Sequence, residues 1–243
     1  MKATQWSFQR VEKKYLMTED QCFRFAEAIK DRIEPDTYPL STICNIYYDT
    51  PDYLLIRRSI EKPVYKEKFR LRSYGVPDDD TPVFMEIKKK FKGIVYKRRV
   101  RAGEDESVRY LAGGPRPNAN DPQILSEIDW FFRKYDLQPG MFVGYERLAF
   151  RSKEDHNLRI TFDWDIRYRV EDMDLRNGDE GIRLFDENMV IMELKIPGAA
   201  PVWLSELLSE LDIYPTSFSK YGRCYLKEFG TNKPIGMEGK RYA

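Results

Sequence analysis

The feature that most constrains the fold of this chain is a period of two among the charged residues of its β-like segments. The segment EKFRLRSYG, residues 67–75, has a basic residue at every second position: Lys68, Arg70 and Arg72. Phe69 and Leu71 alternate with these cations. Since successive side chains of a β-strand point to opposite faces, the segment predicts a strand with one cationic and one apolar face.

Five further segments repeat this design. Their charged faces carry, in order, Glu86, Lys88 and Lys90; Lys97, Arg99 and Arg101; Tyr145, Arg147, Ala149 and Arg151; Arg159, Thr161 and Asp163; and Glu193 and Lys195. One explanation is an antiparallel sheet whose charged face is solvated. That explanation leaves like charges opposite each other on neighbouring strands, which is destabilising. If the sheet closes with these faces inward, it instead forms a basic lumen suited to a polyanion.

Charge is segregated along the chain although the net charge is only +1. Residues 57–101 contain 15 Lys and Arg against 6 Asp and Glu, whereas residues 171–193 contain 8 Asp and Glu against 2 Lys and Arg. Such segregation concentrates electrostatic potential in one part of a fold. A near-zero net charge therefore does not exclude a polyanionic partner.

Length and composition indicate a globular protein, because 243 residues with 42% hydrophobic content can bury a substantial core. No apolar run reaches the roughly 18 residues of a membrane span, and the N-terminus lacks the apolar stretch of a signal peptide. We therefore expect a cytoplasmic protein without a membrane segment. Cys22, Cys44 and Cys224 have no C-x-x-C spacing, which favours reduced thiols over disulfides or zinc. His156, the only histidine, lies in a polar turn and is expected at the surface.

Local signals predict an α+β protein. Thr18 and Gln21 form a capping-box pattern that opens a helix, which we expect to end at Pro35. Asp121 and Pro122 open a second helix, and PVWLSELLSEL predicts a third. Strands are predicted over residues 10–16, 41–50, 65–74, 83–90, 94–101, 141–152, 158–170 and 189–197, with a loop over 102–121. The absence of βαβ alternation favours one antiparallel sheet or barrel decorated by helices, as a single domain with its core at about residues 8–228 and a loose tail from Gly230.

Nine short strings, in this order, resemble the VTC (vacuolar transporter chaperone) domain of the CYTH-like, or triphosphate tunnel metalloenzyme, superfamily. They are RVEKKY, NIYYDT, KEKFRLRSYG, MEIKKK, YKRR, GYERLAF, RITFD, MELKI and SFSKYGR, and the resemblance runs from about Arg10 to Lys227. The resemblance implies an antiparallel eight-stranded tunnel β-barrel with flanking helices. Tyr47 and Tyr48, within NIYYDT, are expected to pack in the core.

The resemblance also implies a polyphosphate polymerase, which transfers the γ-phosphoryl group of ATP to inorganic polyphosphate and releases ADP, with Mn²⁺ or Mg²⁺ as cofactor. It assigns the catalytic phosphate-binding positions to Lys14, Arg70, Arg72, Lys88, Arg147 and Arg159. Further substrate contacts are expected from Arg57, Lys97, Arg99, Lys195 and Lys220, and a metal contact from Glu193. Arg forks and Lys point charges both suit phosphate.

Several alternatives stay open. Glu193 could pair with a neighbouring Lys or Arg instead of a metal, and Glu12 and Glu86 could either join a metal shell or hold basic side chains in place. The chain departs from the family at Ser217, where a lysine is expected, and at Ser59, where an arginine is expected and for which Arg57 could substitute.

Two other functions compete with the polymerase. One is a triphosphatase or nucleotidyl cyclase of the same superfamily, although those relatives usually open with E-x-E-x-K and this chain has Arg10 at the first carboxylate. The other is a polyphosphate or nucleotide sensor without catalysis. Nucleic acid is not expected as a partner, because bases need aromatic platforms in an open groove. The sequence does not indicate an oligomeric state.

Overall fold

One antiparallel sheet organises the whole fold. The structure is a computed structural model that describes residues 10–119 and 121–230. In that part of the chain the strands are β1 (Arg10–Thr18), β2 (Ile33–Asp49), β3 (Tyr65–Tyr74), β4 (Pro82–Phe91), β5 (Ile94–Gly103), β6 (Gln138–Ser152), β7 (Arg159–Arg169), β8 (Ile182–Arg183), β9 (Met189–Pro197) and β10 (Pro215–Thr216). The helices are α1 (Glu19–Ile29), α2 (Leu54–Ile60), α3 (Glu104–Leu111), α4 (Pro122–Tyr135), α5 (Val202–Glu210), α6 (Lys220–Phe229) and the 3₁₀ turn η1 (Leu175–Asn177).

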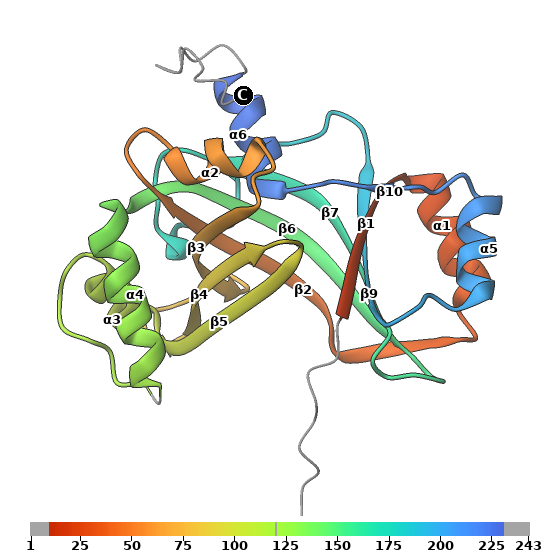
Figure 1. Cartoon of the computed structure of the whole chain (residues 1–243), viewed down its shortest axis with the longest axis horizontal. Coiled ribbons are helices and arrows are strands. Elements are labelled where there is room, and N and C mark those ends of the chain that lie inside the picture. Colours follow the sequence, from red (N-terminus) through yellow and green to blue (C-terminus); the bar gives the residue numbers. More distant parts are fainter. Residues whose placement is uncertain (1–9, 120, 231–243) are drawn as a thin grey trace, which may run out of the picture.

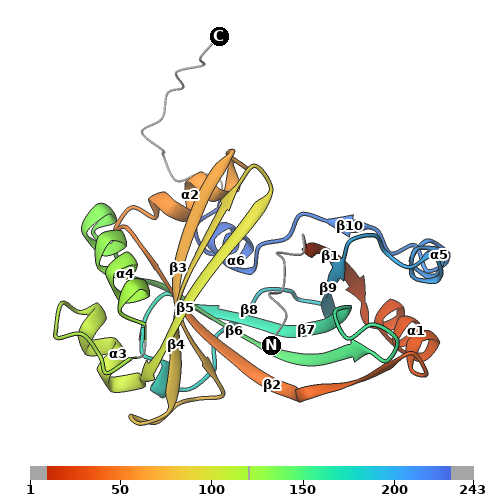
Figure 2. The ribbon, with the colours of Figure 1, turned by 60° about the horizontal axis from the view of Figure 1, so that its bottom comes forward.

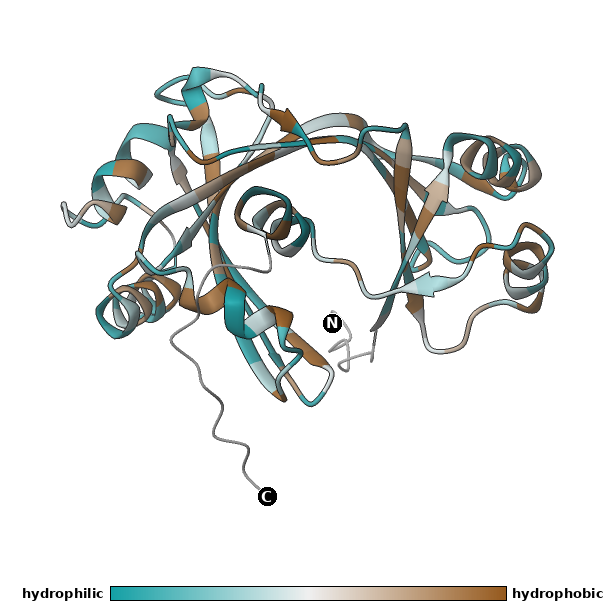
Figure 3. Ribbon diagram, turned by 90° about the horizontal axis from the view of Figure 1, so that it is seen from above, coloured by the Kyte–Doolittle hydropathy of each residue, from teal (hydrophilic) through white to brown (hydrophobic). Residues whose placement is uncertain are grey.

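The strand order is β10-β1-β9-β7-β6-β2-β3-β4-β5, with β8 paired to β7. The sheet curls strongly around α6 (Figure 3). Among the described residues no ladder joins β5 to β10, so the curl is not closed by hydrogen bonds. The predicted antiparallel sheet with flanking helices is confirmed. Eight long strands carry the curl, and the two-residue strands β8 and β10 are additions.

Most local signals are confirmed. Thr18 caps α1 through the predicted capping box with Gln21, and Asp121 caps α4 with Pro122 in its first turn. The boundary predicted at Pro35 is wrong, because α1 ends at Ile29 and the chain has already entered β2. The predicted loop over 102–121 is also wrong in part, since it contains α3.

Apolar faces of the sheet pack against two helix pairs that lie at opposite ends of it (Figure 1, Figure 2). Under α3 and α4 the core includes Phe69 and Met85 of the sheet with Phe131 of α4. Under α1 and α5 it includes Phe25 and Met192. The apolar side of each alternating strand therefore faces outward to the helices, and its charged side faces the inside of the curl.

The third core cluster lies inside the curl and positions α6. Tyr221 of α6 stacks on Tyr47 of β2, with ring centroids 4.4 Å apart. The hydroxyl of Tyr221 donates to Asp49, a fully buried carboxylate at the end of β2. Asp49 also accepts from the backbone N–H groups of Leu55 and Ile56 at the start of α2. One carboxylate thus ties β2, α2 and α6 together.

The division into a single domain with a core from about residue 8 to 228 stays a prediction. Residues 8 and 9 lie outside the described residues, and so does nearly all of the tail predicted from Gly230. The three cysteines are free, as expected, with Cys44 and Cys224 buried. No helix in the described ranges has the length and apolar character needed to cross a membrane.

We predict that Asp49→Ala destabilises the protein by about 3 kcal/mol, because it leaves buried donors from Thr50, α2 and α6 without an acceptor. The free energy of unfolding in denaturant measures this loss. The exposed Asp80→Ala variant is the control and should change stability by less than about 0.5 kcal/mol. Equal stability of the two variants would show that Asp49 does not hold α2 and α6 in place.

Candidate active site

The charged faces of the strands meet inside the curl. Strand register places Lys68 of β3 opposite Lys88 of β4, and Lys88 opposite Lys97 of β5. On the other side of the curl, Lys14 of β1 lies opposite Glu193 of β9. Arg70 contacts Tyr47, which stacks on α6 within the curl, so this face of β3 looks inward. The predicted inward orientation of the cationic rows is therefore what the structure shows.

A first cluster joins β2, β3, β4 and β5. Glu86 of β4 is 1% exposed, accepts from Nε of Arg70 at 2.7 Å and lies 2.6 Å from the amine of Lys97. Arg72, also buried, donates to the side-chain oxygen of Asn45 at 2.8 Å and to the hydroxyl of Tyr145 at 3.2 Å. Burial alone would raise the pKa of Glu86, but Arg70, Arg72 and Lys97 hold it well below its usual range. Glu86 is thus an ionised counterion for the basic side chains.

A second cluster joins β1, β6, β7, β9 and α6. Asp163, with no exposed surface, accepts from Nε of Arg147 at 2.6 Å and from its NH2 at 2.7 Å. Lys220 at the start of α6 donates to Asp163 and lies 3.4 Å from Glu193. Glu193 is also 3.0 Å from the amine of Lys14 and 3.6 Å from Arg147. Two carboxylates and three cations therefore form one network at the centre of the concave face.

Electrostatics keeps Glu193 and Lys220 ionised in this second cluster. Burial would raise the pKa of Glu193, but Lys14, Lys220 and Arg147 lower it well below its usual value. Burial would likewise lower the pKa of Lys220, but Asp163 and Glu193 raise it instead. A phosphate entering this site would meet fixed cations whose orientation is already set by carboxylates.

Several residues of the site were not predicted. Tyr145 accepts from Arg72, and its ring lies 4.5 Å from the amine of Lys220. Tyr47, which was expected only to pack, accepts from Arg70 at 3.2 Å, whereas Tyr48 packs in the core as expected. Asp163 was seen on the charged face of its strand, but its role as the anchor of Arg147 depends on a contact between strands.

The remaining predicted residues lie further from the two clusters. Lys88 is 4.0 Å from Glu12, which also lies 3.7 Å from Lys14, so Glu12 acts as a pairing partner here. Arg159 lies opposite Lys195 in the sheet and forms an ion pair with Asp36.

Arg99 lies opposite Glu86 in the sheet and stacks over Phe84. Arg57 lies on α2 and pairs with Asp52, because residues 54–60 fold as a helix, and its substrate contact stays a prediction. His156 is exposed, as expected.

Glu193 is the residue from which a metal contact is expected. No group of three or more His, Cys, Asp or Glu side chains is placed to hold a metal within residues 10–119 and 121–230. Hard ions such as Mg²⁺ often use only one or two carboxylates and take their other ligands from water and phosphate. The oxygen chemistry and inward position of Glu193 fit such an ion as a single protein ligand, and metal binding there stays a prediction.

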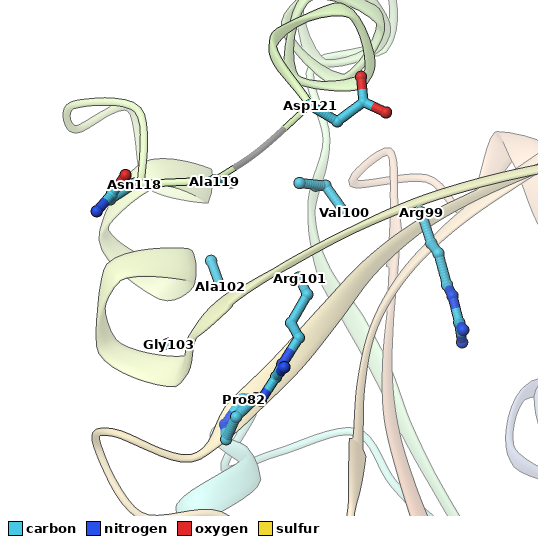
Figure 4. Close-up of a pocket in the computed structure, with 9 residues that line it drawn as sticks. All are labelled: Pro82, Arg99, Val100, Arg101, Ala102, Gly103, Asn118, Ala119 and Asp121. Carbon is cyan, nitrogen blue, oxygen red and sulfur yellow. The ribbon is translucent and has the colours of Figure 1, made fainter.

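A separate pocket of about 480 Å³ lies on the other side of β5, next to α3 and α4 (Figure 4). Val100 and Ala102 line it from the strand, and Asn118, Ala119 and Asp121 line it from the connection to α4. In Figure 4 the side chain of Arg99 points away from Asn118 and Ala119. Arg99 and Arg101 also line the pocket, but no residue of the two clusters does, so it is not the candidate site.

Comparisons with known proteins agree with the geometry. The family model described as "VTC domain" matches residues 9–229. The chain is 29% identical over 236 residues to the vacuolar transporter chaperone complex subunit 4 of Trypanosoma brucei brucei, covering 81% of this chain and 30% of that protein. The subunit 4 of Trypanosoma cruzi is 27% identical, covering 87% of this chain and 31% of that protein. The chain thus spans about a third of the length of these curated relatives.

A solved structure also resembles the fold. A Bacillus halodurans protein described as a candidate adenylate cyclase superposes with a TM-score of 0.55 at 13% identity, covering 90% of this chain and 96% of that chain. At this identity the likeness concerns the fold alone.

Anion binding on this face is expected to depend on the protonation of Lys68. Its amine donates to the hydroxyl of Ser219 at 2.9 Å. Burial, reinforced by Lys66, Lys88 and Lys14 and opposed by Asp49, lowers the pKa of Lys68 to about 7. A bound anion favours the charged amine, so binding above that pKa takes up a proton and weakens as pH rises, by at most about tenfold per pH unit for one group.

We therefore expect calorimetry in buffers of different ionisation enthalpy to detect less proton uptake on tripolyphosphate binding in Lys68→Met than in the unsubstituted protein. The titration of tripolyphosphate itself is common to both proteins and cancels in the comparison. Lys89→Met, on the opposite face of β4 over Trp130, should keep the full uptake. Identical uptake in all three proteins would show that Lys68 does not titrate on binding.

Proposed function

Because the chain belongs to the VTC domain family, we propose that it is a polyphosphate polymerase that transfers the γ-phosphoryl group of ATP to a growing inorganic polyphosphate chain and releases ADP. We further propose that the reaction takes place on the concave face of the sheet, in a tunnel formed by the curl, with ATP and polyphosphate as its ligands. Cytoplasmic placement of this domain belongs to the same proposal.

The observation that carries the proposal is the density of oriented cations on the concave face. Arg147 and Lys220 are fixed by Asp163, and Arg70 is fixed by Glu86. Phosphoryl transfer requires alignment of donor and acceptor and stabilisation of charge on the transferred group more than covalent participation by the protein. A site built from cations that are already oriented supplies these two requirements.

The residues have different roles in this proposal. The forks of Arg70, Arg72 and Arg147 suit the non-bridging oxygens of successive phosphates, which they can bind through paired N–H groups. The attacking group is the terminal oxygen of polyphosphate, an anion that needs no general base. Glu193 would hold Mn²⁺ or Mg²⁺, which when bound neutralises charge on the triphosphate and helps to align it.

The second cluster also explains why an acid is tolerated among phosphate-binding cations. Glu193 and Asp163 keep Lys14, Lys220 and Arg147 in place before any ligand arrives. Without these carboxylates the side chains would repel one another and lose their common orientation. The proposed site thus gives up part of its positive charge and gains preorganisation in return.

The direct test incubates the purified chain with ATP and Mn²⁺, and follows ADP release together with polymer length on a gel. The proposal expects ADP and a ladder of polyphosphate. Release of phosphate without polymer would indicate a triphosphatase, and pyrophosphate with a cyclic nucleotide would indicate a cyclase. Tight, salt-sensitive polyphosphate binding without any product would indicate a sensor. Each of these three outcomes overturns the polymerase.

We predict that Glu193→Gln lowers the rate of polymer synthesis by about 100-fold or more, because it removes the carboxylate that would hold the metal ion. Tripolyphosphate affinity should be kept, because the substitution removes no cation. Calorimetry measures the affinity, and ADP release measures the rate. Glu187→Gln makes the same change on an exposed residue and should match the unsubstituted protein. Full activity of Glu193→Gln would remove Glu193 from the metal assignment.

Arg70→Ala should behave differently, because it removes a fork that would contact phosphate in both the ground state and the transition state. We expect tripolyphosphate affinity to fall by about tenfold, or about 1.4 kcal/mol, together with the rate. The same two measurements check this expectation. Loss of rate with unchanged affinity would place Arg70 outside the ground-state phosphate contacts.

A further inference from the structure

Cations continue along β3 and β4 beyond the residues of the proposed site. Lys66 of β3 lies directly opposite Lys90 of β4, two cross-strand pairs further out than Lys68 and Lys88. The four lysines point to the same face as Arg70, since each is two or four residues away from it or from its cross-strand partner Glu86. We call Lys66, Lys68 and Lys90 the outer lysine track, whose inner end at Lys68 borders the triphosphate site and which leads from there towards the tip of the β4–β5 hairpin.

Several cations inside the curl are paired with acids, whereas no acid among the described residues pairs with the lysines of the outer track. Arg70 and Lys97 share the buried Glu86, and Lys14 is paired with Glu193. In the outer track the amine of Lys66 donates to the backbone carbonyl of Ser59 at 3.3 Å, and that of Lys68 donates to the hydroxyl of Ser219. Within the described ranges, no Asp or Glu lies at ion-pair distance from any of the three amines.

The arrangement carries an energetic penalty in the empty protein. Like charges directly opposite each other in an antiparallel pair are destabilising. Burial lowers the pKa of Lys66, and the charges of Lys90, Lys62 and Lys88 lower it further. The opposite face of β4 differs, because its cation Lys89 packs over Trp130 and lies opposite the acid Glu67. No acid among the described residues relieves the repulsion along the track, and an anionic ligand would do so.

We propose that the outer lysine track binds the part of a linear polyphosphate chain that extends beyond the phosphates held on the concave face, so that this protein prefers polymers to triphosphate. The inference rests on the proposed function and adds the direction in which the polymer runs. At about 3.3 Å per residue, roughly 20 Å separate Lys66 from Arg72 along β3, which is further than a triphosphate reaches. A polymer can bridge both ends, and a triphosphate cannot.

The test compares two probes without ATP: inorganic tripolyphosphate and size-fractionated long-chain inorganic polyphosphate. For the Lys66→Gln/Lys90→Gln variant we expect long-chain affinity to fall about tenfold and the salt dependence of binding to weaken by one to two released ions, at roughly 0.7 to 0.9 per lost phosphate contact. Tripolyphosphate affinity should stay within about twofold. Calorimetry at several salt concentrations measures both probes.

Adjacent single variants give a matched control. Lys90→Gln and Lys89→Gln remove the same charge from neighbouring residues of one strand that face opposite sides. Only Lys90→Gln should weaken long-chain binding. In synthesis from ATP, the double variant should release ADP at an initial rate within about twofold of the unsubstituted protein, and its polymer ladder should be shorter because the growing chain dissociates earlier.

The outcomes separate this inference from the proposed function. Equal weakening by Lys89→Gln and Lys90→Gln would mean a general charge effect, and equal loss of both probes in the double variant would place these lysines within the triphosphate site. Unchanged long-chain affinity in the double variant would remove the track altogether. Each of these results overturns the track while polymer synthesis by the unsubstituted protein still stands. If the unsubstituted protein binds neither probe, the proposed function and the track fall together.

Discussion

The concave face depends on ion pairs that form before any ligand binds. Asp163 and Glu86 are almost completely buried, and each pairs with two basic side chains. Removing such charges from water costs free energy. Ion pairing offsets this desolvation penalty only when the geometry of the pairs is good and the remaining lone pairs are satisfied. Both oxygens of Asp163 accept hydrogen bonds, whereas one oxygen of Glu86 has only the close amine of Lys97 as an ion-pair partner. These contacts hold the cations inside the fold without a bound anion.

The same principle explains the acidic segment that follows β7. Asp179, together with Glu146, binds the buried Arg167, and Asp174 binds Arg176. Part of the acidic excess over residues 171–193 therefore pairs with these arginines, and part of it, through Glu193, lies on the concave face. The exposed acids of the segment are Glu171, Asp172, Glu180, Asp186 and Glu187, and Asp186 pairs with Lys227.

Periodicity predicted the parts of the fold that depend on local pattern. Alternation at Arg70, Lys88 and Arg159 placed each residue on the correct face, because the side-chain period of a strand is fixed by its backbone. The caps at Thr18 and Asp121 were predicted for a similar reason, since a cap is satisfied within three residues. These signals need no knowledge of what lies across the sheet.

The errors concern features that depend on contacts distant in sequence. The helix α2 is held by Asp49 and α6 by its stacking on Tyr47, so these short segments of seven and ten residues became helices through tertiary contacts. The partners of Arg147 and Arg72 could not be read from alternation either, because register between strands decides which carboxylate or tyrosine each arginine meets.

No hydrogen-bonded ladder joins β5 to β10 in the described chain, so pairing of these strands does not fix the width of the curl. In a closed barrel, strand number and stagger together fix the diameter. Here the two margins are free of each other within the described chain, and α6 acts as an internal strut: Lys220 reaches β7 and β9, and Tyr221 reaches β2. The width of the curl is therefore set by one helix and a few polar contacts. A shift of that helix would widen or narrow the curl without breaking a hydrogen bond between strands.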